Sequence, residues 1–406
     1  MDFMKKLLAE NTVALPDFHE VIQKIKAELD KQGVKAEVMV GGSAAKGTYL
    51  KEFDIDIFVR FVKKADPDLL EVILKNCFRK VDRVHGSRDY FQIVHKGQEY
   101  EIVPVLKIAK ASQAQNITDV SMLHVNWVRK HLSRPDEVKL AKLFCKAQSV
   151  YGAESYINGL SGYILEILVV YYGGFMKLVE NAAKWKPKVV IDVSKYYRHR
   201  NDIIKKLNPA KTLGPLIIID PTQKDRNAAA ALSLDTFSKF VFLCREFLKD
   251  PKEDWFRKKP VSMKDIIRAS RHLGTKLTIL KVEPLKGKPD VAFSKLLKAF
   301  NYIKNQLQMN DFQVYRAGYD LKEGNLWYMT LPDKLPVYAK QIGPAVWAPQ
   351  ANIDAFLEKY YTTFLEEDKI IAFRKRKFLT AKDFLASIIK TEYVLEKVNK
   401  ISISKS

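Results

Sequence analysis

Hydrophobic positions recur with two different periods in the first part of the chain. Over residues 17–33, apolar side chains return every three or four positions, which predicts an amphipathic helix. A second helix is expected over residues 66–81. Runs rich in β-branched and aromatic residues predict four strands, at 34–42, 53–61, 88–97 and 98–108. This order of elements indicates a small mixed α/β domain.

The middle of the chain has mainly helical patterns. The segment 133–152 is expected to form a helix with Ser133 as its N-cap, Pro135 in its first turn and Gly152 as its stop. A polar, proline-bounded segment follows near residues 249–260, and strand and helix patterns alternate after it. We therefore predict an α+β multidomain protein with domains at 1–115, 116–256 and 257–406, the second of them helical.

The composition narrows the class of protein. The chain has 406 residues, 47% of them hydrophobic, which is typical of a globular protein with several cores. Its 69 Lys and Arg residues and 47 Asp and Glu residues give a formal net charge of +22. Such an excess repels itself unless a polyanion neutralises it, and nucleic acid is the commonest polyanion. A proteome that is basic throughout would give the same balance.

The cysteines and the apolar segments indicate where the protein works. The three cysteines, Cys77, Cys145 and Cys244, form no C-x-x-C pair, which argues against a disulfide framework or a zinc site and indicates a reducing compartment. The N-terminus has no apolar signal core. The most apolar window, residues 163–175, contains Glu166 and is shorter than the ~20 residues that span a bilayer. We expect a soluble, cytoplasmic protein without a membrane partner.

Two aspartates in the second predicted strand are candidate metal ligands. Asp54 and Asp56 lie on one face of this strand, while Ile55, Ile57 and Val59 lie on the other, apolar face. The two carboxylates are about 7 Å apart along the strand and repel each other. A divalent cation such as Mg²⁺ relieves that repulsion and often bridges carboxylates to a substrate phosphate. The alternative is a solvated strand face.

A later strand offers a third carboxylate. Glu99 and Glu101 share one face of the strand predicted over residues 98–108. If this strand pairs with the one that carries Asp54 and Asp56, Glu101 can join them. Three carboxylates can hold two metal ions about 3.5–4 Å apart, the arrangement used for in-line displacement at phosphorus.

The loop before the aspartates has the residues of an anion site. Gly41 and Gly42 allow a ligand to approach the backbone closely, Ser43 adds a hydroxyl group and Lys46 adds a positive charge. It is not a Walker A loop, because Thr48 stands where the P-loop lysine would be. A plain turn is the alternative. The loop, the two aspartates and the later acidic strand together favour a nucleotide–metal site.

These residues resemble a known signature. A Gly-Ser pair, an Asp-x-Asp motif and a later acidic strand resemble the nucleotidyltransferases of the DNA polymerase β superfamily. Further blocks resemble the archaeal (class I) CCA-adding enzymes, the tRNA nucleotidyltransferases; they lie at 150–175, 189–193, 220–247, 342–344 and 371–378. The resemblance implies a polymerase β-like head with a mixed sheet, a helical neck, and an α+β C-terminal body and tail that bind tRNA.

The resemblance also implies roles for single residues. Asp54, Asp56 and Glu101 match the catalytic carboxylates that hold Mg²⁺, although the family usually has aspartate at the third position. Arg226 matches the arginine that recognises the incoming base. The other matching positions bind the nucleotide: Gly42, Ser43, Lys46, His124, Lys142 and Tyr151.

The residues alone leave other interpretations open for the positions outside the loop. His124 can be a core or capping histidine, and Tyr151 can close a helix against the core. Lys142 lies on a basic stripe with Lys139 and Lys146, which is usually a solvated face. Arg226 can be an ion-pair partner of a neighbouring aspartate, Asp220 or Asp225.

The activity implied by the resemblance is template-independent addition of C, C and A to the 3′ end of tRNA from CTP and ATP. The tRNA acceptor stem would bind the basic C-terminal third, where Arg374, Lys375, Arg376 and Lys377 form a run. Family members are usually homodimers. Two other functions stay open: another nucleotidyltransferase of this superfamily that makes poly(A) or oligoadenylate, and a non-catalytic RNA-binding protein.

Overall fold

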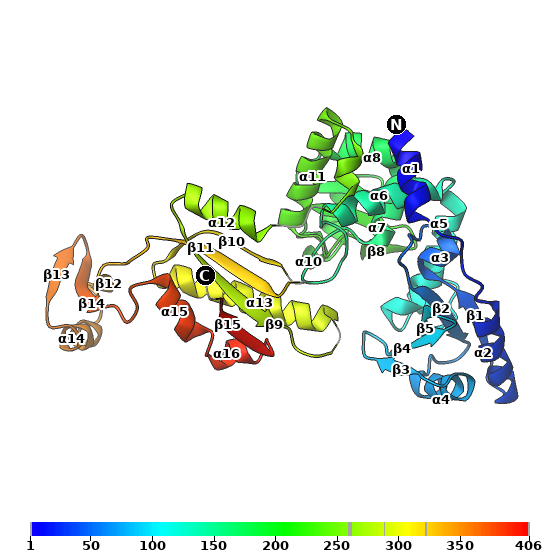
Figure 1. The fold of residues 1–406 in the computed structure, drawn as a ribbon, viewed down its shortest axis with the longest axis horizontal. Coiled ribbons are helices and arrows are strands. Elements are labelled where there is room, and N and C mark those ends of the chain that lie inside the picture. The colour runs from blue at the N-terminus through cyan, green and yellow to red at the C-terminus, as the bar shows by residue number, and fades with distance from the viewer. Residues whose placement is uncertain (1, 259–261, 288, 321–322, 405–406) are drawn as a thin grey trace. The chain divides into compact units, whose positions relative to one another are not determined.

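A five-stranded sheet forms the centre of the N-terminal segment in the computed structural model (Figure 1). The strand order is β1-β2-β5-β4-β3, with β2 and β5 parallel and the other pairs antiparallel. The strands are β1 (Ala36–Val40), β2 (Ile55–Phe61), β3 (Asp82–Val84), β4 (Tyr90–His95) and β5 (Gln98–Leu106). The four predicted strands and the mixed sheet are therefore confirmed. The short strand β3 was not predicted.

The structure describes residues 2–258, 262–287, 289–320 and 323–404. The chain divides into two compact units, residues 1–259 and 260–406. The first unit contains the sheet of Figure 1 and the helices that follow it along the chain. Each unit has a hydrophobic core of its own, which is typical of independent domains.

Two helices cover the apolar face of the head sheet. α2 (His19–Lys31) buries Val21, Ile25 and Leu29 completely, as its three- and four-residue spacing predicts. α4 (Pro67–Cys77) begins where the Asp66 side chain accepts hydrogen bonds from two backbone N–H groups. It ends four residues before the predicted end at residue 81, because the extended backbone of Phe78 places that ring in the core.

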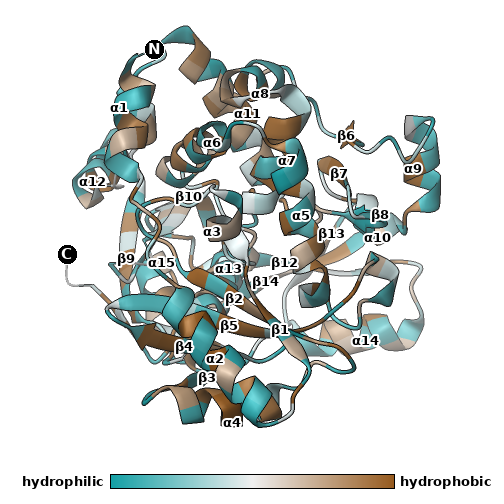
Figure 2. Cartoon of the chain, turned by 90° about the vertical axis from the view of Figure 1, so that its right-hand side faces the viewer, coloured by the Kyte–Doolittle hydropathy of each residue, from teal (hydrophilic) through white to brown (hydrophobic). Residues whose placement is uncertain are grey.

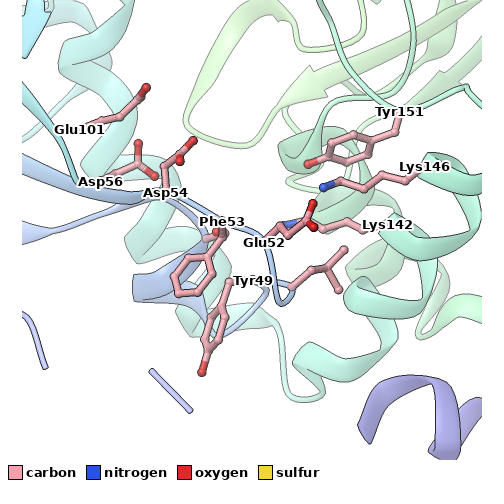
Figure 3. Close-up of a pocket in the computed structure, with 11 residues that line it drawn as sticks. Tyr49, Glu52, Phe53, Asp54, Asp56, Glu101, Lys142, Lys146 and Tyr151 are labelled. Carbon is pink, nitrogen blue, oxygen red and sulfur yellow. The ribbon is translucent and has the colours of Figure 1, made fainter. Parts of the chain in front are cut away.

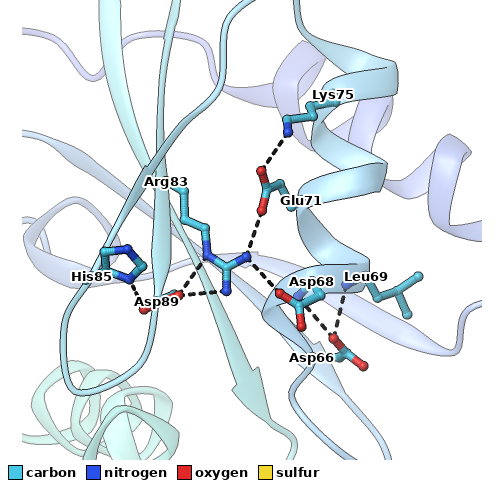
Figure 4. Close-up of polar contacts among 8 residues, drawn as sticks. All are labelled: Asp66, Asp68, Leu69, Glu71, Lys75, Arg83, His85 and Asp89. Carbon is cyan, nitrogen blue, oxygen red and sulfur yellow. Dashed lines mark hydrogen bonds and ion pairs between the residues drawn. The ribbon is translucent and has the colours of Figure 1, made fainter.

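Ion pairs fix the β3–β4 hairpin against α4 (Figure 4). The Arg83 guanidinium on β3 lies 2.7 Å from carboxylate oxygens of Asp68 and Asp89 and 2.8 Å from Glu71. These groups are at the surface, where such pairs contribute only about 0–1 kcal/mol each. Their effect is to orient the hairpin, whose second strand carries Gln92 next to Glu101.

The chain after the head is mainly helical. Its larger helices are α5 (Ser121–His131), α6 (Pro135–Ala147), α7 (Gly162–Tyr172), α8 (Phe175–Ala182) and α11 (Leu234–Lys249). The remaining elements of the first unit, in its described residues, are α1 (Asp2–Asn11) at the N-terminus, α9 (Arg200–Lys206), α10 (Pro209–Thr212), three short 3-10 turns, and the sheet of β6 (Val189–Ile191), β7 (Leu216–Asp220) and β8 (Gln223–Asn227). The rings of Phe144, Phe175 and Phe247 meet in the core. Figure 2 shows hydrophilic and hydrophobic residues alternating along α6 and α8, as amphipathic helices require.

The helix predicted over residues 133–152 is shorter than expected. α6 begins at Pro135, with Arg134 in the N-cap position, so the prediction of Ser133 as N-cap was wrong. The helix ends at Ala147, so Gly152 is not its stop. Gly152 instead has a φ of +118° in the loop that follows Tyr151. Proline in the first turn is confirmed.

The second unit contains two sheets. The first has the order β10-β11-β9-β15 and the second the order β12-β14-β13. The strands are β9 (Lys276–Glu283), β10 (Gln313–Asp320), β11 (Asn325–Leu331), β12 (Tyr338–Ala345), β13 (Thr363–Glu366), β14 (Lys369–Lys375) and β15 (Lys400–Ile403). The helices are α12 (Met263–His272), α13 (Pro289–Met309), α14 (Gln350–Lys359), α15 (Ala381–Ile388) and α16 (Glu392–Leu395). Together with the first unit, this confirms the α+β multidomain fold class.

The described residues contain no single helix that is both long and apolar enough to cross a membrane. The bent pair formed by α7 and α8 passes the same test only when the two helices are taken together. Six consecutive residues of α7, Ile164 to Val169, are buried inside the unit, and Glu166 is one of them.

Candidate active site

The parallel pairing of β2 with β5 brings the predicted carboxylates together. Asp56 pairs with Glu101 across the two strands, and Asp54 directly precedes β2. Ile55, Ile57 and Val59 are fully buried on the opposite face. Figure 3 shows the three acidic side chains side by side at one edge of the site. The two-residue period of a strand predicts that Asp54 and Asp56 share a face, and the pairing of β2 with β5 places Glu101 on the same face.

The carboxylates repel one another in this arrangement. Burial, together with the charges of Glu101 and Asp54, raises the pKa of Asp56 to about 7. The Glu101 Oε1 atom accepts a hydrogen bond of 3.0 Å from Gln92 Nε2. In the part of the chain that the structure describes, no three His, Cys, Asp or Glu side chains converge closely enough to hold an ion. The oxygen donors of Asp54, Asp56 and Glu101 are of the kind that a hard cation takes.

The loop before β2 supports Asp56 from behind. Gly42 begins the short helix α3 (Gly42–Lys46) with a φ of +54°. A Cβ atom built on Gly42 would lie 1.6 Å from Asp56 Oδ2, so only glycine fits against this carboxylate. The next residue, Ser43, faces the pocket described below.

A pocket of about 230 Å³ opens beside the carboxylates (Figure 3). Residues of the head and of the neck line it: Ser43, Tyr49, Leu50, Glu52, Phe53, Asp54, Asp56, Glu101, Lys142, Lys146 and Tyr151. Asp54, Asp56 and Glu101 lie at one side of this pocket and Lys142 and Lys146 at the other, with Glu52 drawn beside the lysines (Figure 3). Such a distribution suits a triphosphate that bridges metal-binding carboxylates and ammonium groups.

Lys142 is held in the pocket wall by the backbone of the head. Its Nζ atom donates to the Thr48 carbonyl at 2.8 Å and lies 3.3 Å from Thr48 Oγ1. Only 5% of Lys142 is exposed. Burial lowers its pKa to about 8, although the charge of Glu166 acts in the opposite direction. Lys146, one helical turn later on α6, lies over the Tyr151 ring, 5.4 Å from its centroid.

Lys46 lies beside the pocket rather than in its lining. Its Nζ atom donates to Glu166 Oε2 at 2.7 Å. The other carboxylate oxygen of Glu166 accepts a hydrogen bond of 2.7 Å from the Thr48 hydroxyl group. Glu166 is fully buried on α7. Lys46 of the head is thus bound to Glu166, a buried carboxylate of the neck.

His124 and Arg226 gather around a second buried carboxylate, Asp220. His124 Nε2 lies 3.1 Å from Asp220 Oδ2, and Arg226 Nη1 donates to the same oxygen. Tyr163 donates to Oδ1 at 3.1 Å and stacks on the His124 ring at a centroid distance of 4.0 Å. Burial alone would raise the pKa of Asp220, but His124, the backbone N–H group of Thr222 and the charge of Arg226 lower it overall. α7 carries both Tyr163 and Glu166, so it links this cluster to the pocket.

The structure thus separates the predicted residues into two groups. Ser43, Asp54, Asp56, Glu101, Lys142 and Tyr151 line the pocket, and Gly42 lies behind it. Lys46, His124 and Arg226 are held by buried carboxylates outside the pocket lining. The ion pair of Arg226 with Asp220, one of the alternatives left open by the sequence, is present.

The sequence analysis did not assign Lys146 or Glu166 to the site, and it also left out the pocket-lining residues Tyr49, Leu50, Glu52 and Phe53. Lys146 is four positions after Lys142 and therefore on the same helix face. Glu166 is the single charge of the apolar window at 163–175, and a charged residue in a fully buried helix needs a partner. These spacings were the available signals.

Three family models match successive segments of the chain. Residues 22–119 match the family described as a nucleotidyltransferase domain, and residues 136–257 match the second domain of tRNA nucleotidyltransferases. Residues 273–403 match the C-terminal domain of CCA-adding enzymes. The nucleotidyltransferase family uses divalent metal ions.

Full-length relatives give the same result. A CCA-adding enzyme of Nanoarchaeum equitans is 36% identical over 337 residues, which cover 82% of this chain and 82% of that protein. The chain belongs to the archaeal CCA-adding enzymes. A further member, from Methanosarcina barkeri, is 32% identical over 390 residues and covers 90% of this chain and 83% of its own. The chain is therefore an enzyme, a tRNA nucleotidyltransferase.

Solved structures agree on the fold. The Cid1 poly(U) polymerase, in a structure bound to MgATP, matches with a TM-score of 0.50 at 14% identity. The alignment covers 64% of this chain and 98% of that one. The polymerase β-like nucleotidyltransferase fold of the CCA-adding family is thereby confirmed for this chain.

Proposed function

We propose that this enzyme adds C, C and A to the 3′ end of tRNA without a nucleic-acid template, using CTP and ATP. The observation that carries the proposal is the pocket in which the carboxylates of β2 and β5 face the lysines of α6. Membership of the CCA-adding family supplies the substrate class. Family models match the head, the neck and the C-terminal segment of this chain. Matches over all three parts favour CCA addition over poly(A) synthesis or non-catalytic RNA binding.

Asp54, Asp56 and Glu101 would hold two Mg²⁺ ions. When bound, these ions supply the positive charge that favours the ionised 3′ hydroxyl group and the leaving pyrophosphate. Glu101 accepts the proton of that hydroxyl group. The 3′ oxygen then forms a bond to the α-phosphorus, the bond from this phosphorus to the bridging oxygen breaks, and pyrophosphate leaves.

The other predicted site residues, inside and beside the pocket, position the nucleotide. The Ser43 hydroxyl group and the ammonium groups of Lys46 and Lys142 bind the triphosphate, and Gly42 leaves room for the Asp56 carboxylate against the loop. Tyr151 and His124 orient the sugar and the triphosphate. Positioning and charge stabilisation supply most of the catalysis in phosphoryl transfer.

A product assay tests the proposal. The enzyme is incubated with tRNA that lacks its last three nucleotides, with Mg²⁺, and with both CTP and ATP, one of which is radiolabelled. We expect two C and one A to be added, then a stop, and no addition when EDTA removes the metal. An open-ended A tail would instead identify a poly(A)-type enzyme. Binding of tRNA without any incorporation would leave only an RNA-binding protein.

Arg226 is proposed to select the base. A guanidinium can donate to cytosine O2 or N3 and to adenine N1, but not to the N–H donors of guanine N1 or uracil N3. Asp220 fixes this arginine, whose side chain is 27% exposed. We expect Arg226→Ala to lower kcat/KM for CTP and ATP by about 10- to 100-fold and to narrow the gap to UTP and GTP.

The matched control for Arg226 is Lys224→Ala, which removes an exposed charge two residues earlier on β8. This variant should keep the wild-type preference for CTP and ATP. Steady-state incorporation of all four nucleotides gives the comparison. If Arg226→Ala keeps the wild-type selectivity, Arg226 does not select the base, and backbone groups or the tRNA end must do so.

The basic run at the end of β14, residues 374–377, is proposed to bind the tRNA acceptor stem. Arg374, Lys375 and Lys377 are exposed, and Arg376 pairs with Asp311. Arg374 also lines a pocket of about 200 Å³ with Phe312, Phe378 and Phe384 among its walls. Double-helical RNA is bound mainly through its shape and phosphates, so exposed guanidinium and ammonium groups suit it.

Reversing one charge tests this surface. Arg374→Glu is expected to weaken tRNA binding about tenfold and to reduce the slope of log K against log salt by about 1, because one phosphate contact is lost. Fluorescence anisotropy with labelled tRNA over a salt series measures both. Lys264→Glu, an exposed site on α12, is the control and should change neither. Equal effects of the two variants would indicate a general charge effect.

We also propose three domains, at 1–115, 116–256 and 257–406, and a homodimer. The family matches at 22–119, 136–257 and 273–403 support the three-part division. The homodimer rests on the family resemblance, and sedimentation equilibrium measures it directly. A protein that stays monomeric over the micromolar range would exclude it.

A further inference from the structure

A fully buried carboxylate connects the head to the neck beside the active site. Glu166 on α7 has no exposed surface. Its neighbours Leu165, Ile167 and Leu168 are core residues, so a charged side chain lies among apolar ones. Its two oxygen atoms have different partners. Oε2 accepts from Lys46 on α3, and Oε1 accepts from Thr48, each at 2.7 Å. Both partners belong to the segment that leads from the glycine loop to Asp54.

A second cation completes the network. The Thr48 hydroxyl group that donates to Glu166 lies 3.3 Å from the Nζ atom of Lys142, and the Thr48 carbonyl accepts from the same ammonium at 2.8 Å. Thr48 is fully buried and Lys46 is 10% exposed. One carboxylate therefore stands between two lysines that would otherwise repel each other. Burying these charges is costly unless each is paired, and here each ammonium has an oxygen partner.

We propose that Glu166 is a positioning residue for nucleotide binding, which holds Lys46 and, through Thr48, Lys142 in the geometry that receives the triphosphate. The inference rests on the proposed function of the two lysines. Glu166 is too deeply buried to touch the substrate itself. It uses one of the three donors of the Lys46 ammonium and leaves the others for phosphate oxygens. It also fixes the side-chain rotamers of Lys46, which reduces the entropy cost of binding.

The charge of Glu166 also keeps Lys142 protonated. Burial and the charges of Lys46 and Lys146 lower the pKa of Lys142, the charges of Glu166 and Asp56 raise it, and together these effects give a pKa of about 8. Because only the protonated ammonium binds phosphate well, kcat/KM for the nucleotide should fall as the pH rises through this pKa. Removing the charge of Glu166 should therefore move the fall to lower pH.

Glu166→Gln tests the proposal because the amide has nearly the same shape and no charge. We expect KM for CTP and ATP to rise about tenfold, with kcat changed much less, since the lost interaction acts on bound substrate and transition state alike. The alkaline limb of the kcat/KM profile should move to lower pH. Glu166→Asp, which keeps the charge on a shorter side chain, should recover part of the loss. Direct titration with CTP, without tRNA, gives an independent affinity.

The control is Glu137→Gln on α6. Glu137 is partly buried in the same domain and accepts the backbone N–H of Phe175 at 2.7 Å, so its loss should lower thermal stability without changing KM or the pH profile. If Glu166 only supports the fold, Glu166→Gln will behave like Glu137→Gln, and the proposal is overturned. A wild type that adds no CCA would instead overturn the proposed function.

A double variant shows whether Glu166 acts through Lys46. Lys46→Met should raise KM for the nucleotides by itself. If Glu166 acts through this lysine, adding Glu166→Gln should change KM by less than the product of the two single effects, because the partners share one interaction. Independent, multiplying effects would contradict a positioning role through Lys46.

Discussion

Replacing Glu101 with glutamine is expected to reduce CCA addition by about three orders of magnitude in kcat. Glu101 lies opposite Asp56 in the parallel β2–β5 pair and is the proposed base for the 3′ hydroxyl group. The amide can neither accept that proton nor neutralise a metal ion. Metal and base contributions are worth several kcal/mol, and each 1.36 kcal/mol is a factor of ten in rate. Single-turnover incorporation of labelled CTP measures the effect on chemistry.

The matched control for Glu101 is Glu99→Gln. Glu99 lies two residues earlier on the same face of β5, but it pairs with Val94 at the far end of the strand and is exposed. Its replacement should leave kcat nearly unchanged. The opposite pattern, an active Glu101→Gln and an inactive Glu99→Gln, would transfer the role of the third carboxylate to Glu99. Full activity of both variants would leave Asp54 and Asp56 as the only essential carboxylates.

Gly42→Ala is expected to lower activity by at least about 100-fold, because a methyl group at Gly42 would lie 1.6 Å from Asp56 Oδ2 and push this carboxylate out of place. A displacement of about 1 Å at a catalytic group costs about this factor. Gly42 has a positive φ, which alanine adopts less readily, so the substitution should also lower the unfolding free energy by about 1 kcal/mol. CCA incorporation and thermal unfolding separate the two effects.

Gly33→Ala isolates the backbone penalty. Gly33 also has a positive φ, +66°, but a Cβ atom there would meet nothing within 4 Å. Gly33→Ala should lose about 1 kcal/mol of unfolding free energy and keep its activity, whereas Gly42→Ala should lose at least as much stability and also lose activity. If the two variants are equally active, Asp56 tolerates displacement and its role as a fixed metal ligand is wrong.

The sequence predicted the parts of the site that depend on local periodicity. The alternation of Asp54 and Asp56 with buried isoleucines follows from the two-residue repeat of a strand, and the same rule placed Glu101 on its face. The helix α2 followed from its three- and four-residue spacing. In these cases one segment contains the whole pattern, and the structure confirms the arrangement.

Contacts between distant segments could not be predicted in this way. Lys46 and Glu166 are 120 residues apart, so the pattern around either one does not name its partner. The same holds for His124 and Asp220, which are 96 residues apart. The predicted N-cap at Ser133 was wrong for a local reason, since Pro135 begins the helix with Arg134 before it. Short strands such as β3 have too few residues to show a period.

The buried Glu166 limits how this enzyme can be divided into modules. A head taken from one relative and a neck taken from another must agree on a basic residue at Lys46, a hydroxyl group at Thr48 and a carboxylate at Glu166, because a mismatch leaves a charge stranded in the core of the neck. The head and the neck therefore have to be inherited together. The second unit has its own core and supplies no partner to Glu166, so its exchange between relatives would leave this network intact.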